Sequence, residues 1–380
     1  MKSFDWIAER RELERLVDEL VDSGAYALDT EFHRERTYLP QLALIQLATR
    51  GRLALVDALA VDVASLRRAF ESDAICTMHA GSQDLEILQL ACGEVPRRIF
   101  DTQIAALFSG YRTTSLGKLV EDLLEVRLDK SAQLTDWTRR PLPEADQRYA
   151  ASDVAHLLDL RDVLIRRLDE DGRLSWAEEE IERLRTRDRS RPDPETLWWK
   201  LRGKSKLGGK ARGVAQELAS WREGVAQRKN RPPRTVLSDM ALLALAQRPA
   251  RSAADLRGVR NFDPKRFKYT EDLLAAIRHG FELPKDQLRL PPKKPENLPQ
   301  VDGVIALCLA WLSQRAHEEG IDVSVLGTRD DVTELVLNQE SRLAKGWRQA
   351  LVGHELKSII GGTATLRVDG TQLELVDRTA

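Results

Sequence analysis

Residues 25–31 read Ala25-Tyr26-Ala27-Leu28-Asp29-Thr30-Glu31, an apolar run that ends in two carboxylates one residue apart. Such a run of small, aromatic and aliphatic side chains predicts a buried β-strand. Alternation along a strand places Asp29 and Glu31 on the same face, where both can reach one cation. The Asp-x-Glu pattern alone is weak evidence, because it recurs at Asp84-Leu85-Glu86 and at Asp193-Pro194-Glu195. Its meaning therefore depends on the sequence around it.

Apolar runs that follow this strand indicate a mixed α/β layer. The expected elements are strands over 42–47 and 53–56, a helix over about 62–71, a strand over 75–78 and a helix over about 82–90. Gly51-Arg52 predicts a hairpin turn, so the sheet begins antiparallel. From 101 to about 184 the spacing is helical, and Pro141 and Pro143 mark a break before a long helix that begins near Glu144.

The composition is that of a folded and heavily charged protein, with 42% hydrophobic and 31% charged residues over 380 positions. This length predicts two or three domains of about 100 to 200 residues each. No apolar run approaches the roughly 20 residues that cross a membrane, and the N-terminus lacks a signal peptide, so we expect a cytoplasmic protein. Cys76, Cys92 and Cys308 fit neither a disulfide framework nor a zinc site and are expected to be buried.

Segments rich in Pro and Gly divide the chain behind residue 190. Residues 191–194 and 203–210 predict a linker, and a second Pro-rich break at 291–299 divides the helical remainder. Weak similarity around Trp221 and Trp311 indicates two copies of one small helical domain, with both rings in its core. The expected domains are an α/β domain over 1–190, a basic linker over 191–211, and helical domains over 212–290 and 300–375.

Positive charge is concentrated in one part of a chain whose formal net charge is −1. Between Arg183 and Arg234 there are sixteen basic and five acidic residues, so this segment carries +11 and the remainder −12. A basic stretch of this kind is typical of proteins that bind nucleic acid. A solvated linker that is merely kept soluble by its charge is the alternative interpretation.

Two further groups of residues complete a candidate acidic site. Asp84 lies on the helix after the strand that ends near Met78, and Tyr149 stands four residues before Asp153, on one helix face. Each acid alone is better explained as a cap or a solvated side chain. Four carboxylates brought together repel one another unless cations lie between them. Carboxylates without a Cys/His cluster favour Mg²⁺ or Mn²⁺ over zinc, and two such ions can support phosphodiester hydrolysis.

In this order, the motifs of the first 190 residues resemble those of the ribonuclease D family, within the four-acid exonuclease superfamily. The motifs are Asp29-Thr30-Glu31-Phe32, the run from Thr37 to Leu47, the run from His79 to Glu86, Asp101-Thr102-Gln103, the run from Lys130 to Leu142, and Tyr149-x-x-x-Asp153. The combination is specific. The tail is similar, less closely, to the paired helicase-and-ribonuclease-D C-terminal (HRDC) domains found behind that nuclease.

This resemblance implies a ribonuclease-H-like α/β domain with a mixed sheet, followed by two small all-α helical-bundle domains. It also implies a hydrolytic 3′→5′ exoribonuclease that releases 5′-nucleotides and processes the 3′ ends of tRNA precursors and other small structured RNAs. The implied ligands of two divalent ions, Mg²⁺ or Mn²⁺, are Asp29, Glu31, Asp84 and Asp153. Tyr149 would orient the attacking water or help to deprotonate it, which requires hydrogen-bond reach of that water.

The resemblance implies substrate-binding residues as well. They are Phe32, stacked on the terminal base, and His79, Lys130 and Trp137, which would line the substrate path. Asp101 and Asp136 are possible supporting acids, although a helix N-cap explains Asp101 equally well. Asp57, at the end of the third strand, is interpreted as structural.

Two other functions remain open on the sequence alone. The four acids do not distinguish ribose from deoxyribose, so a DNA 3′→5′ exonuclease fits the same residues. The second is a nucleic-acid-binding module that has lost its activity, although the intact acids argue against it. The expected partner is RNA with a single-stranded 3′ end. We expect no membrane and no stable protein partner, and therefore a monomer.

Overall fold

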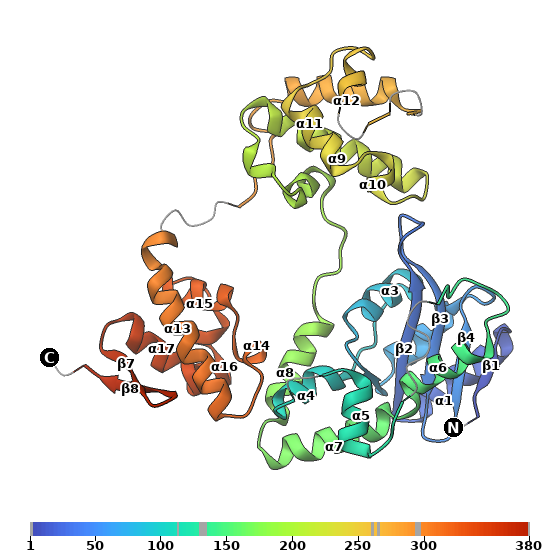
Figure 1. The fold of residues 1–380 in the computed structure, drawn as a ribbon. Helices are drawn as coiled ribbons and strands as arrows, with labels where there is room; N and C mark the ends of the chain where they lie inside the picture. The colour runs from blue at the N-terminus through green and yellow to red at the C-terminus, as the bar shows by residue number, and fades with distance from the viewer. Residues whose placement is uncertain are drawn as a thin grey trace. The chain divides into compact units, whose positions relative to one another are not determined.

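A six-stranded mixed sheet forms the centre of the first part of the chain. The computed structural model describes residues 3–111, 114–128, 135–259, 262–263, 267–292 and 298–378. The chain separates into two units (Figure 1). The first contains Met1–Glu31, Leu42–Asp188 and Pro295–Ala380. The second contains Phe32–Gln41 and Arg189–Lys294.

The sheet has the strand order β1-β4-β3-β2-β5-β6, which places β2 and β3 at its centre. The strands are β1 Asp5–Ile7, β2 Ala25–His33, β3 Gln41–Ala48, β4 Leu53–Asp57, β5 Ile75–Met78 and β6 Ile99–Asp101. β3 and β4 pair antiparallel, whereas β1 with β4, β2 with β5, and β5 with β6 pair parallel. The predicted mixed sheet with an antiparallel hairpin at Gly51 is confirmed.

Alternation along β2 divides its side chains between two hydrophobic cores. Ala27 packs into the core that holds residues of α4 to α7, and Tyr26 and Leu28 pack into the core that holds residues of α1 to α3. The helices are α1 Arg10–Asp22, η1 Val63–Leu66, α2 Arg67–Glu71, α3 Ser82–Cys92, α4 Thr102–Phe108, α5 Leu116–Leu124, α6 Glu144–Ala155, α7 Leu157–Glu170 and α8 Leu174–Arg185. By its register, Asp29 shares the face of Ala27. The predicted start of α6 is confirmed, but the helix ends at Ala155 instead of continuing.

The last 80 or so residues pack against the α/β domain within the same unit. Trp347 stacks on Trp176 with ring centroids 4.6 Å apart, and Arg348, only 1% exposed, donates to the carboxylates of Glu179 and Glu180 on α8. The elements are α13 Leu298–Glu318, α14 Val323–Leu326, α15 Arg329–Val336, η5 Arg342–Ala344, α16 Gly346–Arg348, the π-helix η6 Gln349–Gly353, α17 His354–Ile360, β7 Ala364–Asp369 and β8 Gln372–Asp377. The sequence did not predict this packing.

One detail of the expected all-helical tail is wrong. β7 and β8 form an antiparallel hairpin, with Leu366 opposite Leu375 and Gly370 at φ +58° in the turn. The sequence contains a signal for this hairpin, since Gly370-Thr371 lies between runs of alternating apolar and polar residues. A glycine at the first of two loop positions is typical of a two-residue type II′ hairpin turn.

The second unit is a helical bundle around the buried Trp198. Its elements are η2 Pro194–Lys200, η3 Lys204–Lys206, α9 Lys210–Arg228, α10 Pro233–Val236, α11 Asp239–Gln247, η4 Asp255–Gly258 and α12 Thr270–Glu282. The segment 32–41 belongs to this unit, because the Tyr38 hydroxyl donates to Glu223 at 2.6 Å and the Tyr38 N–H to Asn230 at 3.1 Å.

The close approach of α9 and α12 depends on glycine. A Cβ at Gly213 would lie 2.4 Å from the Gly280 carbonyl oxygen, a distance that only a backbone shift could relieve. We therefore expect Gly213→Ala to lower the free energy of unfolding by about 1–3 kcal/mol, the usual cost of overpacking. Thermal and denaturant unfolding would measure it.

Gly224 on the same helix supplies the matched control. Its Cβ would meet only the end of the flexible Arg228 side chain, at 3.2 Å. Gly224→Ala should leave the stability unchanged or raise it by up to about 1 kcal/mol, since alanine has the higher helix propensity. Equal effects of the two substitutions would show that α9 and α12 do not require this close contact.

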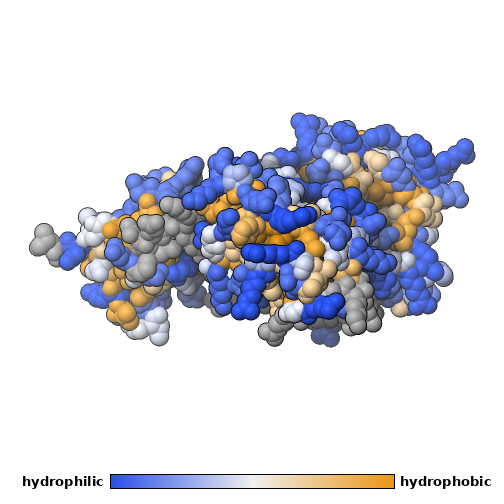
Figure 2. Space-filling model, turned by 90° about the horizontal axis from the view of Figure 1, so that it is seen from above, coloured by the Kyte–Doolittle hydropathy of each residue, from blue (hydrophilic) through white to orange (hydrophobic). Residues whose placement is uncertain are grey.

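The surface is mainly hydrophilic, as the high fraction of charged residues predicts. Hydrophilic residues cover most of the face drawn in Figure 2, interrupted by smaller hydrophobic areas. The three cysteines are free and buried, as predicted. Among the residues that the structure describes, none of the helices combines the length and the apolar character needed to cross a membrane.

Candidate active site

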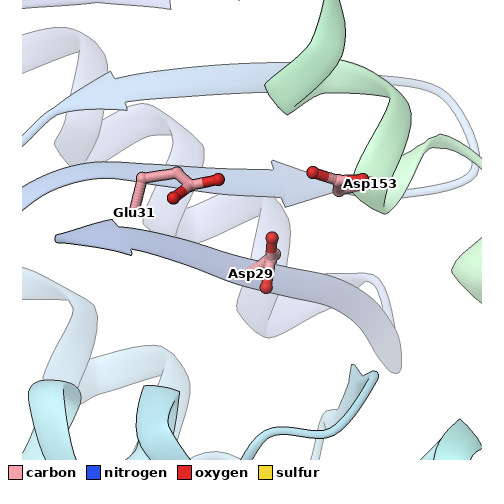
Figure 3. Close-up of side chains that lie close together, drawn as sticks. All are labelled: Asp29, Glu31 and Asp153. Carbon is pink, nitrogen blue, oxygen red and sulfur yellow. The ribbon is translucent and has the colours of Figure 1, made fainter. Parts of the chain in front are cut away.

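The centre of the candidate site is the end of β2, where the strand carries two acids on one face. Asp29 and Glu31 can each offer a carboxylate oxygen to a common cation together with Asp153 of α6, with the three atoms within 4.8 Å of one another. Figure 3 shows these side chains turned toward a shared space. The strand register predicted the pairing of the first two, and the fold adds the third by laying α6 over the same face of the sheet.

α6 carries a tyrosine and an aspartate of the candidate site on one face. Tyr149 precedes Asp153 by one helical turn, so both side chains lie on the face of α6 that is directed at β2. The ring of Trp137 packs against Tyr149 with centroids 6.3 Å apart. The Gln147 side chain donates to the Leu142 carbonyl at 2.7 Å, which ties the first turn of α6 to the segment before it.

Asp84 approaches from the opposite layer. It lies in the first turn of α3, is 7% exposed, and accepts a hydrogen bond from the hydroxyl of Thr30. Thr30 points to the face of β2 opposite Asp29, which explains why Asp84 is outside the group of three oxygens within 4.8 Å. The sequence suggested no role for Thr30, although any residue between two such acids must face the neighbouring helix layer.

Burial and like charge dominate the electrostatics of this group. Burial raises the pKa of Asp29 well above its usual range, and the neighbouring carboxylates raise it further. The same causes raise the pKa of Glu31 to about 8, and burial raises that of Asp153 to about 7. Burial also raises the pKa of Asp84, which the Thr30 hydroxyl opposes. Protein groups alone therefore leave these anions poorly stabilised.

A divalent cation fits this arrangement. The donors are carboxylate oxygens, which Mg²⁺ and Mn²⁺ prefer, and the mutual repulsion of the acids is the force that a cation would relieve. The described residues that could hold such an ion are Asp29, Glu31 and Asp153, with Asp84 beside them. The chemistry of the donors is that of a site for one or more hard cations.

The raised pKa values predict how stability depends on pH. A carboxyl with a folded-state pKa above its unfolded value stabilises the fold at low pH, and this contribution is lost as the pH rises through the folded pKa. For Glu31 the loss extends from about pH 4.5 to about pH 8. The chelator-treated protein should therefore lose stability over this window, and Mg²⁺ or Mn²⁺ should restore more at pH 8 than at pH 5.5.

Thermal unfolding at both pH values, with chelator and with each metal, measures this effect. Glu31→Gln removes one of the titrating groups and should flatten the pH dependence of the chelator-treated protein. A metal-induced increase in Tm that is the same at both pH values, or absent, would contradict the assignment of the carboxylates as metal ligands.

Asp101 stabilises the backbone turn that precedes α3. Its carboxylate accepts from the backbone N–H groups of Ala80 at 3.2 Å and Gly81 at 2.8 Å, and it also caps α4. It thus holds the turn that leads into α3 and Asp84. The N-cap explanation is confirmed, and Asp136 likewise caps the turn at Thr138.

Arg140 and Asp57 form a second support. The guanidinium donates to both carboxylate oxygens of Asp57, at 2.7 and 2.6 Å, and to the carbonyls of Ala43 and Trp137. This bidentate ion pair and the bond to Ala43 hold the segment before α6 against β3 and the end of β4. The structural interpretation of Asp57 is consistent with this contact.

The predicted substrate-binding residues have different surroundings. Phe32 follows Glu31 in β2, and the Arg34 guanidinium lies 4.9 Å from its ring centroid. The ring of Trp137 is 8% exposed and supports Tyr149 instead of presenting an open face. His79 hydrogen-bonds Thr102 at 2.9 Å, and burial lowers its pKa. Lys130 lies outside the described residues.

A mixed six-stranded sheet with an acidic group on β2, and a Tyr one helical turn before an acid on α6, defines an exonuclease domain of the ribonuclease-H-like fold. The family described as 3′-5′ exonuclease matches residues 4–169, and the HRDC domain matches residues 211–277. Over its whole length the chain belongs to the ribonuclease D family. It is a 3′→5′ exonuclease, a hydrolase.

The similarity to individual relatives extends over almost the whole chain. Ribonuclease D of Gluconacetobacter diazotrophicus is 34% identical over 97% of this chain and 96% of its own length. Ribonuclease D of Granulibacter bethesdensis is 33% identical over 97% of this chain and 96% of its own length. The crystal structure of Escherichia coli RNase D, described as an exoribonuclease involved in structured RNA processing, superposes with a TM-score of 0.85 at 28% identity over 95% of this chain and 99% of that one.

Proposed function

We propose that the chain shortens single-stranded 3′ ends of RNA by hydrolysis with two divalent ions and releases 5′-nucleotides. The observation that carries the proposal is the group of three half-buried carboxylates with oxygens within 4.8 Å of one another, beside Asp84 and Tyr149. Asp29, Glu31, Asp84 and Asp153 would hold the ions. When bound, a pair of Mg²⁺ or Mn²⁺ ions supplies an activated water and neutralises charge on the departing 3′ oxygen.

Tyr149 acts on the attacking water in this proposal. Burial and the negative charges of Asp153 and Glu31 raise the pKa of its phenol to about 12, so the hydroxyl stays protonated at neutral pH. A protonated phenol orients water by hydrogen bonding, and this favours a positioning role over that of a phenolate base. Trp137 would keep the phenol in place through ring packing.

For the substrate, we propose the 3′ ends of tRNA precursors and other small structured RNAs in the cytoplasm, with the chain acting as a monomer. Support comes from the family and from the basic segment between Arg183 and Arg234, which can bind phosphates. Replacing exposed basic residues of this segment, such as Arg202 and Lys206, with alanine should then weaken RNA affinity and reduce its salt dependence.

Digestion of matched RNA and DNA oligonucleotides tests the choice of nucleic acid. The proposal predicts faster shortening of RNA than of DNA with the same sequence and a single-stranded 3′ end. Equal or faster shortening of DNA would favour a DNA exonuclease. Failure to shorten either strand in Mg²⁺ or Mn²⁺ would favour a binding module without activity.

A further inference from the structure

The hydrogen-bond donors of the Arg140 side chain are all occupied within the chain. Nε and Nη2 donate to the two carboxylate oxygens of Asp57, at 2.7 and 2.6 Å. Nη2 also donates to the Ala43 carbonyl at 2.8 Å, and Nη1 donates to the carbonyls of Trp137 and Arg139, each at 2.8 Å. Because a guanidinium has only about five N–H donors, Arg140 keeps none for a phosphate of the substrate.

The sheet fixes the position of this guanidinium. Asp57 is the last residue of β4 and Ala43 lies in β3, so the bonds to them join Arg140 to two neighbouring strands. The ring of Trp6 on β1 lies against the guanidinium, with 5.5 Å between Cζ and the ring centroid. The Asp57 side chain is only 8% exposed, which shields the ion pair from water. A bidentate pair of this kind fixes direction as well as distance.

The segment that Arg140 holds carries Trp137, whose ring touches the candidate site. Its carbonyl accepts from Arg140, and its ring packs against Tyr149 with centroids 6.3 Å apart and planes inclined by 32°. Tyr149 is partly exposed, whereas Ala150 and Ala151 beside it on α6 are buried in the core. The phenol thus lies at the margin of the core, where packing against Trp137 fixes its direction.

We propose that Arg140 is a positioning residue of the reaction, because it holds Trp137, and Trp137 holds the Tyr149 hydroxyl at the attacking water. Arg140 itself touches neither the RNA nor the metal ligands. A misplacement of a reacting group by about 1 Å can lower a rate roughly 100-fold, so a residue that acts only through Tyr149 changes kcat. The inference rests on the proposed function in one respect, namely that Tyr149 orients the water.

Two other roles of Arg140 give different experimental results. An arginine that binds an RNA phosphate raises KM when it is replaced and reduces the salt dependence of RNA binding. An arginine that only stabilises the fold lowers Tm when it is replaced and leaves the kcat of the folded protein unchanged. A positioning residue lowers kcat without changing the affinity for RNA.

Arg140→Lys in the full chain is the first variant of the test. Lysine keeps the charge but has fewer donors and no planar fork, so the two-pronged bond to Asp57 is lost. The single-turnover rate of RNA cleavage should fall about tenfold, as expected for a displaced reacting group. RNA affinity in chelator and Mn²⁺ affinity measured by electron paramagnetic resonance should stay within about twofold of the wild type, because neither involves Tyr149.

Tyr149→Phe supplies the background that distinguishes positioning from every other role. A chain without the hydroxyl has no group left for Arg140 to position, so the double variant should be slower than Tyr149→Phe by less than about twofold. Trp137→Phe leaves the ion pair intact and tests the second half of the link. It should also slow cleavage about tenfold, and this effect should likewise disappear in the Tyr149→Phe background.

Arg52→Lys is the matched control for the loss of an arginine that joins elements of the same sheet domain. Arg52 donates to Asp5 on β1 and to Glu19 on α1, each at 2.7 Å. This variant should keep the wild-type rate and both affinities. Thermal unfolding verifies that each variant is folded at the assay temperature, and Trp137→Phe decides the question if Arg140→Lys does not fold.

The outcomes separate this inference from the proposed function. If Tyr149→Phe slows cleavage but Arg140→Lys and Trp137→Phe behave like Arg52→Lys, the positioning role is wrong and the proposed function stands. Equal losses of rate in the wild-type and Tyr149→Phe backgrounds also overturn it, as does a loss confined to RNA affinity. A wild-type chain that cleaves no RNA contradicts the proposed function itself, before any variant is compared.

Discussion

Asp29→Asn is expected to lower the rate of RNA hydrolysis by roughly 1,000-fold or more, since a bound metal contributes several kcal/mol of transition-state stabilisation. Asp29 lies among the other acids, whose charges all raise its pKa. An amide keeps the shape of the side chain but loses the charge that attracts the cation. Initial rates on end-labelled RNA in saturating Mg²⁺ measure the effect.

Stability distinguishes a lost ligand from a lost fold in this variant. Removing one of several repelling carboxylates should leave the chelator-treated protein at pH 8 at least as stable as the wild type. Asp22→Asn, on the exposed end of α1, is the matched control and should keep full activity. An active Asp29→Asn variant would remove Asp29 from the catalytic group, and an unfolded one would assign it a structural role.

Tyr149→Phe has the second largest expected effect. Loss of the hydroxyl that orients the water should lower kcat by roughly 100-fold, the cost that misplacement of a reacting group can carry. The ring remains packed against Trp137, so RNA affinity and metal binding should be unchanged. Single-turnover cleavage and RNA binding, measured on the same variant, separate these quantities.

Tyr111→Phe serves as the control for this substitution. The Tyr111 hydroxyl accepts from Arg167 at 2.9 Å, so the variant also loses one hydrogen bond of a tyrosine in the first unit. It should retain the wild-type kcat. A Tyr149→Phe variant with unchanged kcat would show that another group orients the water, and a change confined to RNA affinity would make Tyr149 a substrate-binding residue.

The sequence predicted most of what lies on one chain element. The apolar run before Asp29 predicted the strand, and its period of two predicted that Glu31 shares the face of Asp29. Likewise the spacing of four predicted that Tyr149 and Asp153 share a face of α6. Relations of this kind follow from backbone geometry alone.

What the sequence could not predict depends on packing between elements. Nothing local shows that α6 crosses the face of β2 that carries Asp29, or that Thr30 holds Asp84 from the other layer. The stacking of Trp347 on Trp176 joins the tail to the α/β domain across 171 positions of sequence. The β7–β8 hairpin is different, because the Gly370-Thr371 turn between alternating runs is a signal that the sequence contains.

The central claim is that the acids of β2, α3 and α6 remove nucleotides from the 3′ end of RNA with the help of metal. Digestion of a 5′-end-labelled single-stranded RNA by the wild type and by Asp153→Asn, with Mg²⁺ and with chelator, tests it most directly. We expect a ladder that shortens by one nucleotide at a time with wild type and Mg²⁺ only, and 5′-nucleotides as products. Internal cleavage, cleavage in chelator, or an Asp153→Asn variant as active as the wild type would contradict it.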